Sequence, residues 1–139
     1  MSQIERRFIE MPYSKQPDYP YSQPAVLVPP CPTLYIQGQV AWDEHARKVA
    51  TGHDVADQTR QIFKNFTDVL AEANGTLDDI VHMIVFILEM DRFDDFLEVR
   101  KEFYPHGKYP PTTGMGVPRM AQPDLRIEIH ATAAAPHLR

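Results

Sequence analysis

Two ionisable side chains near the end of the sequence have a spacing that suits proton transfer. In residues 125–134, LRIEIHATAA, apolar residues such as Ile127 and Ile129 alternate with Glu128 and His130. This alternation predicts a β-strand with one apolar and one polar face. Glu128 and His130 then point to the same side, about 6.5–7 Å apart along the strand. A carboxylate beside an imidazole can work as an acid and a base near neutral pH, but a strand with its polar side in water has the same pattern.

The segment before this strand is rich in turn-forming residues. Residues 109–120 read YPPTTGMGVPRM. Thr112, Thr113, Gly114 and Gly116 could present backbone N–H groups to an anion, as in a nest. A plain flexible turn explains the same residues equally well.

The composition is typical of one globular domain spanning residues 1–139. Of the 139 residues, 43% are hydrophobic and 24% are charged, which is enough for a single core. A formal net charge of −5 without a Lys/Arg cluster argues against nucleic acid as a partner. The single cysteine rules out an intramolecular disulfide, and no run has the length of a membrane span or the pattern of a signal peptide. We therefore expect a cytoplasmic protein with no membrane partner, and no metal site, because no His, Cys, Asp or Glu residues have metal-ligand spacing.

Hydrophobic periodicity predicts two helices and six strands. The helix over residues 54–74 has one continuous apolar stripe and should end at a left-handed Gly75. Gly38 suggests a bulge in its strand, and His82, inside an apolar strand, is expected to be packed. The strands are expected over residues 6–11, 25–28, 34–40, 80–90, 112–117 and 125–134, the second helix over 93–104, and a polar loop over 42–52.

The strand over residues 80–90, IVHMIVFILEM, is apolar on both sides. Two helices can cover only one face of the sheet that contains it. The other face must then be buried by something outside the chain, so oligomerisation is expected. Assembly would move Glu128 and His130 from a wet surface to a junction between subunits.

Short motifs follow one another along residues 19–134. They are Pro20-Tyr21-Ser22-Gln23, Leu34-Tyr35-Ile36, Gly38-Gln39-Val40, Asp54, Gln58-Thr59-Arg60-Gln61, Asn65, Leu70, Gly75, Asp78-Asp79-Ile80-Val81, Val85-Phe86, Asp91, Phe93, Phe103 and Ile127-Glu128-Ile129. In this combination the sequence resembles the Rid family, also called YjgF/YER057c/UK114. The resemblance implies an α+β, chorismate-mutase-like fold, with a mixed sheet of about six strands, two helices on one face and a homotrimeric assembly. Residues 19–134 would form the core, and residues 1–18 an N-terminal extension.

The resemblance also implies a chemistry. The family is known for hydrolysing reactive enamines and imines made by pyridoxal-phosphate enzymes, without a metal or an organic cofactor. The resemblance further implies a small-molecule cleft between subunits. The substrate-binding residues that we assign to this cleft are Tyr21, Gln37, Gly38, Thr112, Thr113, Gly114 and Arg119. Glu128 matches the family's acidic residue, so it is the expected acid and base, with His130 assisting.

One position departs from the family pattern. Family deaminases carry an arginine, in a P-x-R-S/T motif, that pairs with the substrate carboxylate, whereas the present sequence reads Pro110-Pro111-Thr112-Thr113. A threonine hydroxyl replaces a charged, bidentate fork at this position. Arg119 and Arg126 could each supply a positive charge, although a loop cation and an ion pair are the simpler interpretations. We therefore predict enamine or imine chemistry on a small metabolite other than a simple 2-imino acid.

Two further functions fit the same resemblance. A non-catalytic small-molecule-binding trimer would use the same clefts for sensing or protection. An endoribonuclease or translation-inhibiting role, sometimes attributed to relatives, is opposed by the acidic charge balance.

Overall fold

The computed structural model describes residues 6–19, 21–47 and 54–139. Its strands are β1 (Arg7–Ile9), β2 (Ala25–Leu27), β3 (Thr33–Gln39), β4 (Ile80–Ile87), β5 (Thr112–Gly116) and β6 (Ile127–Ala134), and its helices are α1 (Val55–Glu72) and α2 (Phe93–Phe103). Short 3-10 helices span Pro12–Lys15, Leu77–Asp79 and Met90–Arg92. Each strand and each α-helix overlaps its predicted range, whereas the three 3-10 helices were not predicted. Of the loop expected over residues 42–52, only 42–47 lie within the described residues.

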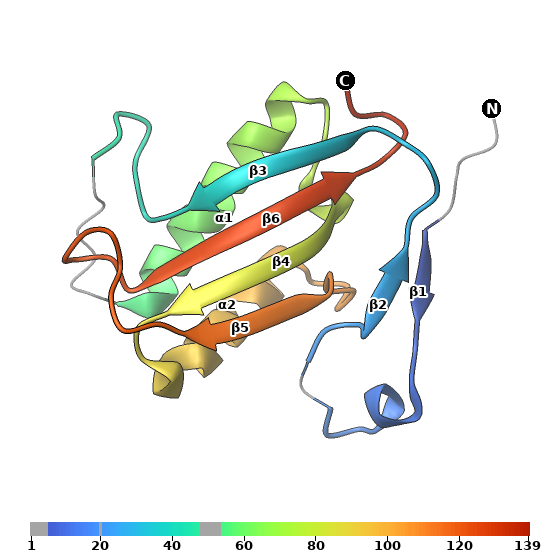
Figure 1. Ribbon diagram of the computed structural model, residues 1–139, viewed down its shortest axis with the longest axis horizontal. Coiled ribbons are helices and arrows are strands. Elements are labelled where there is room, and N and C mark those ends of the chain that lie inside the picture. Colours follow the sequence, from blue (N-terminus) through green and yellow to red (C-terminus); the bar gives the residue numbers. More distant parts are fainter. Residues whose placement is uncertain (1–5, 20, 48–53) are drawn as a thin grey trace.

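The strands form two sheets rather than one. A four-stranded sheet has the order β3-β6-β4-β5, in which only β4 and β5 are parallel, while β1 and β2 form a separate antiparallel pair (Figure 1). The expected single sheet of about six strands was therefore wrong. Residues 28–32, VPPCP, separate β2 from β3, and their prolines offer no N–H to a strand ladder. The N-terminal hairpin therefore stands beside the main sheet.

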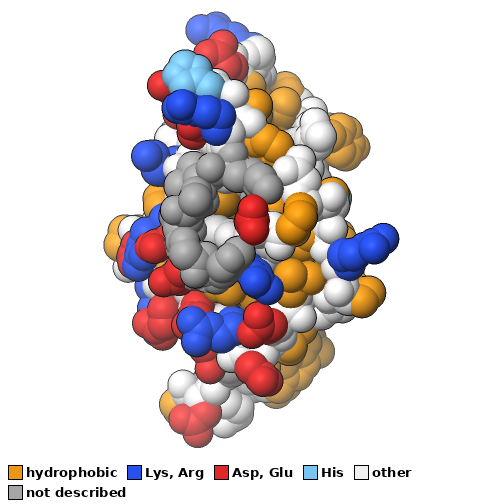
Figure 2. Space-filling model, turned by 90° about the vertical axis from the view of Figure 1, so that its left-hand side faces the viewer, with side chains coloured by type: hydrophobic (Ala, Val, Ile, Leu, Met, Phe, Trp, Pro, Cys, Tyr) orange, Lys and Arg blue, Asp and Glu red, His pale blue; other side chains and the backbone are white. Residues whose placement is uncertain are grey.

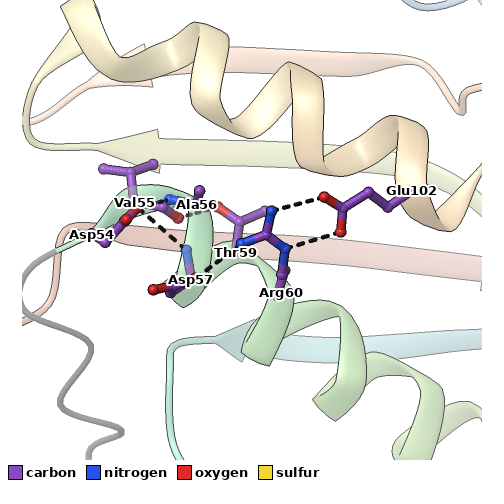
Figure 3. A network of polar contacts seen from close by, with 7 residues as sticks. All are labelled: Asp54, Val55, Ala56, Asp57, Thr59, Arg60 and Glu102. Atoms are coloured by element: carbon purple, nitrogen blue, oxygen red, sulfur yellow. Dashed lines mark hydrogen bonds and ion pairs between the residues drawn. The ribbon is translucent and has the colours of Figure 1, made fainter.

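Both helices cover the same face of the four-stranded sheet (Figure 1), as predicted. The apolar stripe of α1 is buried, including Ile62, Phe63 and Phe66 at 0% exposure. Asp54 caps α1, because its side chain accepts hydrogen bonds from the backbone N–H groups of Ala56 and Asp57 (Figure 3). Among the residues that the structure describes, no helix is long and apolar enough to cross a membrane.

An ion-pair network joins the two helices. The Arg60 guanidinium on α1 donates to both Glu102 carboxylate oxygens on α2, over 2.8 and 2.9 Å, and to Asp57 over 2.9 Å (Figure 3). The hydrogen bonds from Arg60 lower the pKa of the Glu102 carboxyl, because they favour its charged form. The network lies at the surface of the helical layer.

The end of α1 differs from the prediction. Asn74, and not Gly75, adopts the left-handed conformation, with φ of 60°, which asparagine tolerates better than most residues. Gly75 is needed for a different reason. A Cβ at Gly75 would lie 2.7 Å from Leu138 Cδ2, so the glycine allows the C-terminal segment to pack closely here.

The two faces of β4 and β6 have different surroundings. Met83, Val85, Ile87, Ile127 and Ile129 point toward the helices and are fully buried. Ile84 pairs with His130, and Phe86 with Glu128, on the other face. We call this second face, which no described helix covers, the open face. In Figure 2, patches of hydrophobic side chains lie along the right-hand border, where the open face lies, with a Lys or Arg side chain projecting between them, and most of the charged side chains lie nearer the helices.

His82 belongs to the open face. It pairs with Thr132 and is exposed, so the expectation of a packed histidine was wrong. The register shift between Ile80 and His82 changes the alternation at the start of β4, which the sequence pattern alone did not show.

Candidate functional site

Glu128 and His130 are in direct contact on the open face. His130 Nε2 lies 3.0 Å from Glu128 Oε2, and the two side chains are 46% and 34% exposed, respectively. The Phe86 ring meets the His130 imidazole edge to face, with centroids 5.1 Å apart. The imidazole is thus held by an apolar contact on one side and by a carboxylate on the other, while both polar groups remain accessible.

Gly38 makes room for this pair. The register between β3 and β6 shifts between Ile36 and Gln39, which confirms the expected bulge. A Cβ at Gly38 would lie 2.5 Å from His130 Nε2 and 3.0 Å from Glu128 Cδ. Gln37 is exposed in the same bulge, and its carbonyl accepts a hydrogen bond from the Gln39 side chain. The bulge therefore places bare backbone beside the two ionisable side chains.

A cavity of about 580 Å³ lies between the N-terminal segment and the edge of the sheet. Tyr21 and Ser22 line it from the N-terminal side, and His82, Thr112 and Thr113 line it from β4 and β5. Tyr13 and Tyr19 complete an aromatic wall with Tyr21, with neighbouring ring centroids 5.7 and 5.5 Å apart. The cavity therefore has a mixed surface of tyrosines and small hydroxyl groups.

The predicted site residues form two clusters within one chain. Thr113 pairs with Ile84, which pairs with His130, so two strand spacings, about 9–10 Å, separate Thr113 from His130. The first cluster is the Glu128–His130 pair with Gly38 and Gln37. The second cluster is the cavity, with Tyr21, Thr112 and Thr113. The two clusters are neighbours, and they are not one continuous site in a single chain.

Thr112 and Gly114 belong partly to the helix-covered side. They pair with Met83 and Val85, whose side chains are buried beneath the helices. The Thr112 hydroxyl donates to the Pro110 carbonyl over 2.8 Å, and a Cβ at Gly114 would lie 2.4 Å from the Phe93 ring. Thr113 is consequently the β5 threonine that shares a face with His130.

Arg119 and Arg126, the two arginines that could supply a positive charge, are not among the residues that line the cavity. Arg119 is exposed in the segment after β5. Arg126 forms an ion pair with Glu89 at 3.6 Å, in agreement with the simpler interpretation. Among the described residues, no group of three or more His, Cys, Asp or Glu side chains could hold a metal ion.

Sequence reasoning did not single out Arg100, which contacts Ser22 of the cavity lining. Arg100 lies on α2, is only 2% exposed, and donates from Nη1 to Ser22 Oγ over 2.7 Å. Burial lowers the pKa of its guanidinium to about 10, so the group remains charged at neutral pH. The available clue was a charged residue on the apolar stripe formed by Phe93, Phe96 and Phe103.

The fold and the site define a small α+β domain with an acidic residue on an uncovered sheet face. The chain belongs to the family described as endoribonuclease L-PSP, whose model matches residues 13–135. A relative from Dermatophagoides farinae, named 2-iminobutanoate/2-iminopropanoate deaminase, is 30% identical over 126 residues, which are 91% of this chain and 94% of that protein.

Two solved structures extend this comparison. YyfB from Yersinia pestis, described as a protein of unknown function of the conserved Rid protein family, is 32% identical, with a TM-score of 0.81 over 93% of this chain and 98% of that one. TdcF from E. coli, solved with bound serine, is 28% identical, with a TM-score of 0.65 over 73% of this chain and 80% of that one. These matches confirm the resemblance to the Rid family.

Proposed function

We propose that this protein hydrolyses a reactive enamine or imine, with Glu128 as the acid and base and His130 assisting it. The observation that carries the proposal is the 3.0 Å contact between Glu128 Oε2 and His130 Nε2 on an accessible sheet face. A carboxylate in this position can take a proton from water as the water oxygen attacks the C=N carbon. That proton passes to the nitrogen and gives a carbinolamine; the carboxylate then takes the proton of the new hydroxyl group and hands it to the nitrogen, so that the C–N bond breaks, ammonia leaves and a carbonyl compound remains.

His130 would act on this chemistry through its contact with Glu128. The imidazole can hydrogen-bond to the carboxyl through Nε2 and hold it in place between the two steps. Gly38 supports the arrangement, because it leaves space beside both side chains. Phe86 supports it by holding the imidazole ring.

The relatives support the same class of reaction. The relative from Dermatophagoides farinae is named 2-iminobutanoate/2-iminopropanoate deaminase, and TdcF was solved with serine, a small molecule with an amino group and a carboxylate. Thr112 replaces the expected arginine, and its hydroxyl is already bonded to Pro110. We therefore propose a substrate other than a simple 2-imino acid.

We further propose that three copies assemble through their open faces, with a ligand cleft at each junction. Tyr35 on this face is 82% exposed, and Ile84 and Phe86 are only partly buried within one chain. Partners that cover these side chains would remove apolar surface from water. Sedimentation in dilute buffer tests this proposal, since a trimer has three times the mass of the chain, and a monomeric mass would contradict it.

The activity is tested with freshly generated imines. An amino-acid oxidase supplies 2-iminopropanoate and bulkier imines, and semicarbazide traps whatever is not hydrolysed. We expect Glu128→Gln to lower turnover of an accepted imine by about 10²-fold or more, and Thr112→Arg to raise turnover of 2-iminopropanoate. Glu89→Gln is the matched control, because Glu89 pairs with Arg126 outside the cavity.

Each result has a distinct meaning. Unchanged turnover in Glu128→Gln would contradict the assigned role. Equal turnover of 2-iminopropanoate by the wild type and Thr112→Arg would show that the arginine is dispensable and that the substrate is an ordinary 2-imino acid. No turnover in any variant would favour the non-catalytic small-molecule binder.

A further inference from the structure

Arg100 is a buried cation that has no acidic partner among the residues that the structure describes. Arg100 is 2% exposed, and its Nε atom is buried without a hydrogen-bond partner. Among the described residues, Ser22 accepts a hydrogen bond from the guanidinium, Tyr109 and Tyr104 favour its charged form, and Lys101 opposes it with a like charge; none of these groups is a carboxylate. The guanidinium carbon lies 3.7 Å from the Tyr109 ring centroid, a cation–π contact.

This arrangement is costly unless the charge has a use. Burying an ionised group without a countercharge is unfavourable, and a well-packed apolar side chain in its place is often equally stable or more stable. The ring of Tyr109 and one hydroxyl compensate the guanidinium only in part. The environment of Arg100 therefore favours the arrival of an anion.

Ser22 connects this charge to the cavity. Its Oγ accepts the hydrogen bond from Arg100, and the residue also lines the cavity. A hydroxyl that accepts one hydrogen bond can donate another, and a donor polarised by a cation is a better donor. The described residues that line the cavity include no Asp, Glu, Lys or Arg, and Ser22 joins this lining to the charge of Arg100.

We propose that the cavity is a carboxylate-binding site, in which the Ser22 hydroxyl donates to the carboxylate and Arg100 supplies the buried countercharge. Arg100 acts through Ser22 and is a specificity-determining residue. The site rests on the proposed function and deepens it, because it names the substrate class. The substrate is an enamine or imine with a carboxylate that meets Ser22 instead of a bidentate arginine at position 112.

This placement differs from recognition through residue 112. Thr112 has its hydroxyl committed to Pro110, whereas the Ser22 hydroxyl has a cation directly behind it. A single hydroxyl fixes the direction of a carboxylate less strictly than an arginine fork does. The cavity would thus still prefer substrates with a carboxylate, but it would no longer require the geometry of a 2-imino acid.

A pair of probes that differ in charge tests the site. Propanoate and propanamide have nearly the same shape, and their binding to the full chain is followed by NMR through the backbone amides of Ser22 and Thr113. We expect propanoate to bind about tenfold tighter than propanamide, as for a hydrogen bond to a charged group. Arg100→Met and Ser22→Ala should each lose most of this preference.

Arg92→Met is the matched control. Arg92 carries the same charge at the start of α2 but pairs with Asp95 at the surface, so its removal should leave the preference for propanoate intact. Thermal unfolding shows whether Arg100→Met is folded, and Ser22→Ala tests the same connection without changing the buried charge. Ser22→Thr, which keeps a hydroxyl, should restore much of the preference.

Equal binding of the two probes to the wild type would overturn the proposal, and so would a preference that survives both Arg100→Met and Ser22→Ala. No turnover is involved in this experiment. Selective propanoate binding without imine hydrolysis would therefore refute the proposed function and leave the carboxylate site standing. Imine hydrolysis without charge selectivity would do the reverse.

Discussion

The two faces of the β4–β6 ladder are built by alternate residues of the same strands. On one face, Ile127 and Ile129 are completely buried beneath α1 and α2. On the other face, Glu128 and His130 remain accessible beside Gly38. A shift of one residue in register would exchange the two sets. The apolar set therefore fixes the position of the polar pair, and the fold and the proposed chemistry depend on the same register.

The two faces also tolerate change differently. The helix-covered face is packed on every side, so a lost methyl group leaves a cavity there. On the open face no described helix covers the side chains of the same chain, and His130 is 46% exposed there. We expect substitutions on the first face to lower stability, and substitutions on the second to alter function first.

The largest expected effect is a difference in the free energy of unfolding between variants of two neighbouring residues of β6, Ile129 and His130. Ile129→Ala should lower the free energy of unfolding by about 2–5 kcal/mol, because Ile129 is fully buried. His130→Ala should change it by no more than about 0.5 kcal/mol, since the His130 side chain is about half exposed within one chain. Urea denaturation of both variants at the same protein concentration measures the difference. Similar losses in the two variants would show that the faces are not distinct in the way described.

A smaller effect on stability, with a larger one on activity, is expected at Gly38. The Cβ in Gly38→Ala would overlap His130 Nε2, and because the imidazole is half exposed it can rotate away at little cost. Its contact with Glu128 would then be lost. We expect a folded protein with strongly reduced imine turnover.

Gly116→Ala is the control for this substitution. Gly116 lies in β5 of the same sheet, and the nearest atom to its added Cβ is 3.8 Å away, an ordinary contact. It should retain both activity and thermal stability. Full turnover in Gly38→Ala would mean that the Glu128–His130 contact is not needed for the reaction.

The helices and the alternating strands could be predicted because local patterns define them. The apolar stripe of α1 and the Asp54 cap lie within one segment, and the polar alternation of β6 placed Glu128 beside His130 without knowledge of neighbours. The homotrimer and the catalytic roles of these two residues stay predictions.

Contacts between distant segments could not be predicted in this way. Ser22 and Arg100 are 78 positions apart in the sequence, and no periodicity indicates which loop will meet the inner side of α2. The division into two sheets and the exposure of His82 also depend on pairing between segments. Asn and Gly can both adopt the left-handed conformation that ends a helix. The sequence therefore did not show that Asn74, rather than Gly75, would adopt it.

The smallest effect is expected in the layer that covers the buried face. Glu102 on α2 holds Arg60 on α1, and this pairing lowers the pKa of the Glu102 carboxyl. A group with a lowered pKa in the folded state contributes stability that is fully present above its unfolded pKa and is lost as the pH falls through the folded value. Glu102→Gln should therefore be slightly less stable than the wild type at pH 7, and the difference in Tm should shrink toward zero in acid. Glu98→Gln removes a carboxylate that pairs only within α2, with Lys101, and should not weaken the link between the helices. A difference in Tm for Glu102→Gln that stays constant from neutral to acidic pH would show that packing, rather than the ion pair, joins the two helices.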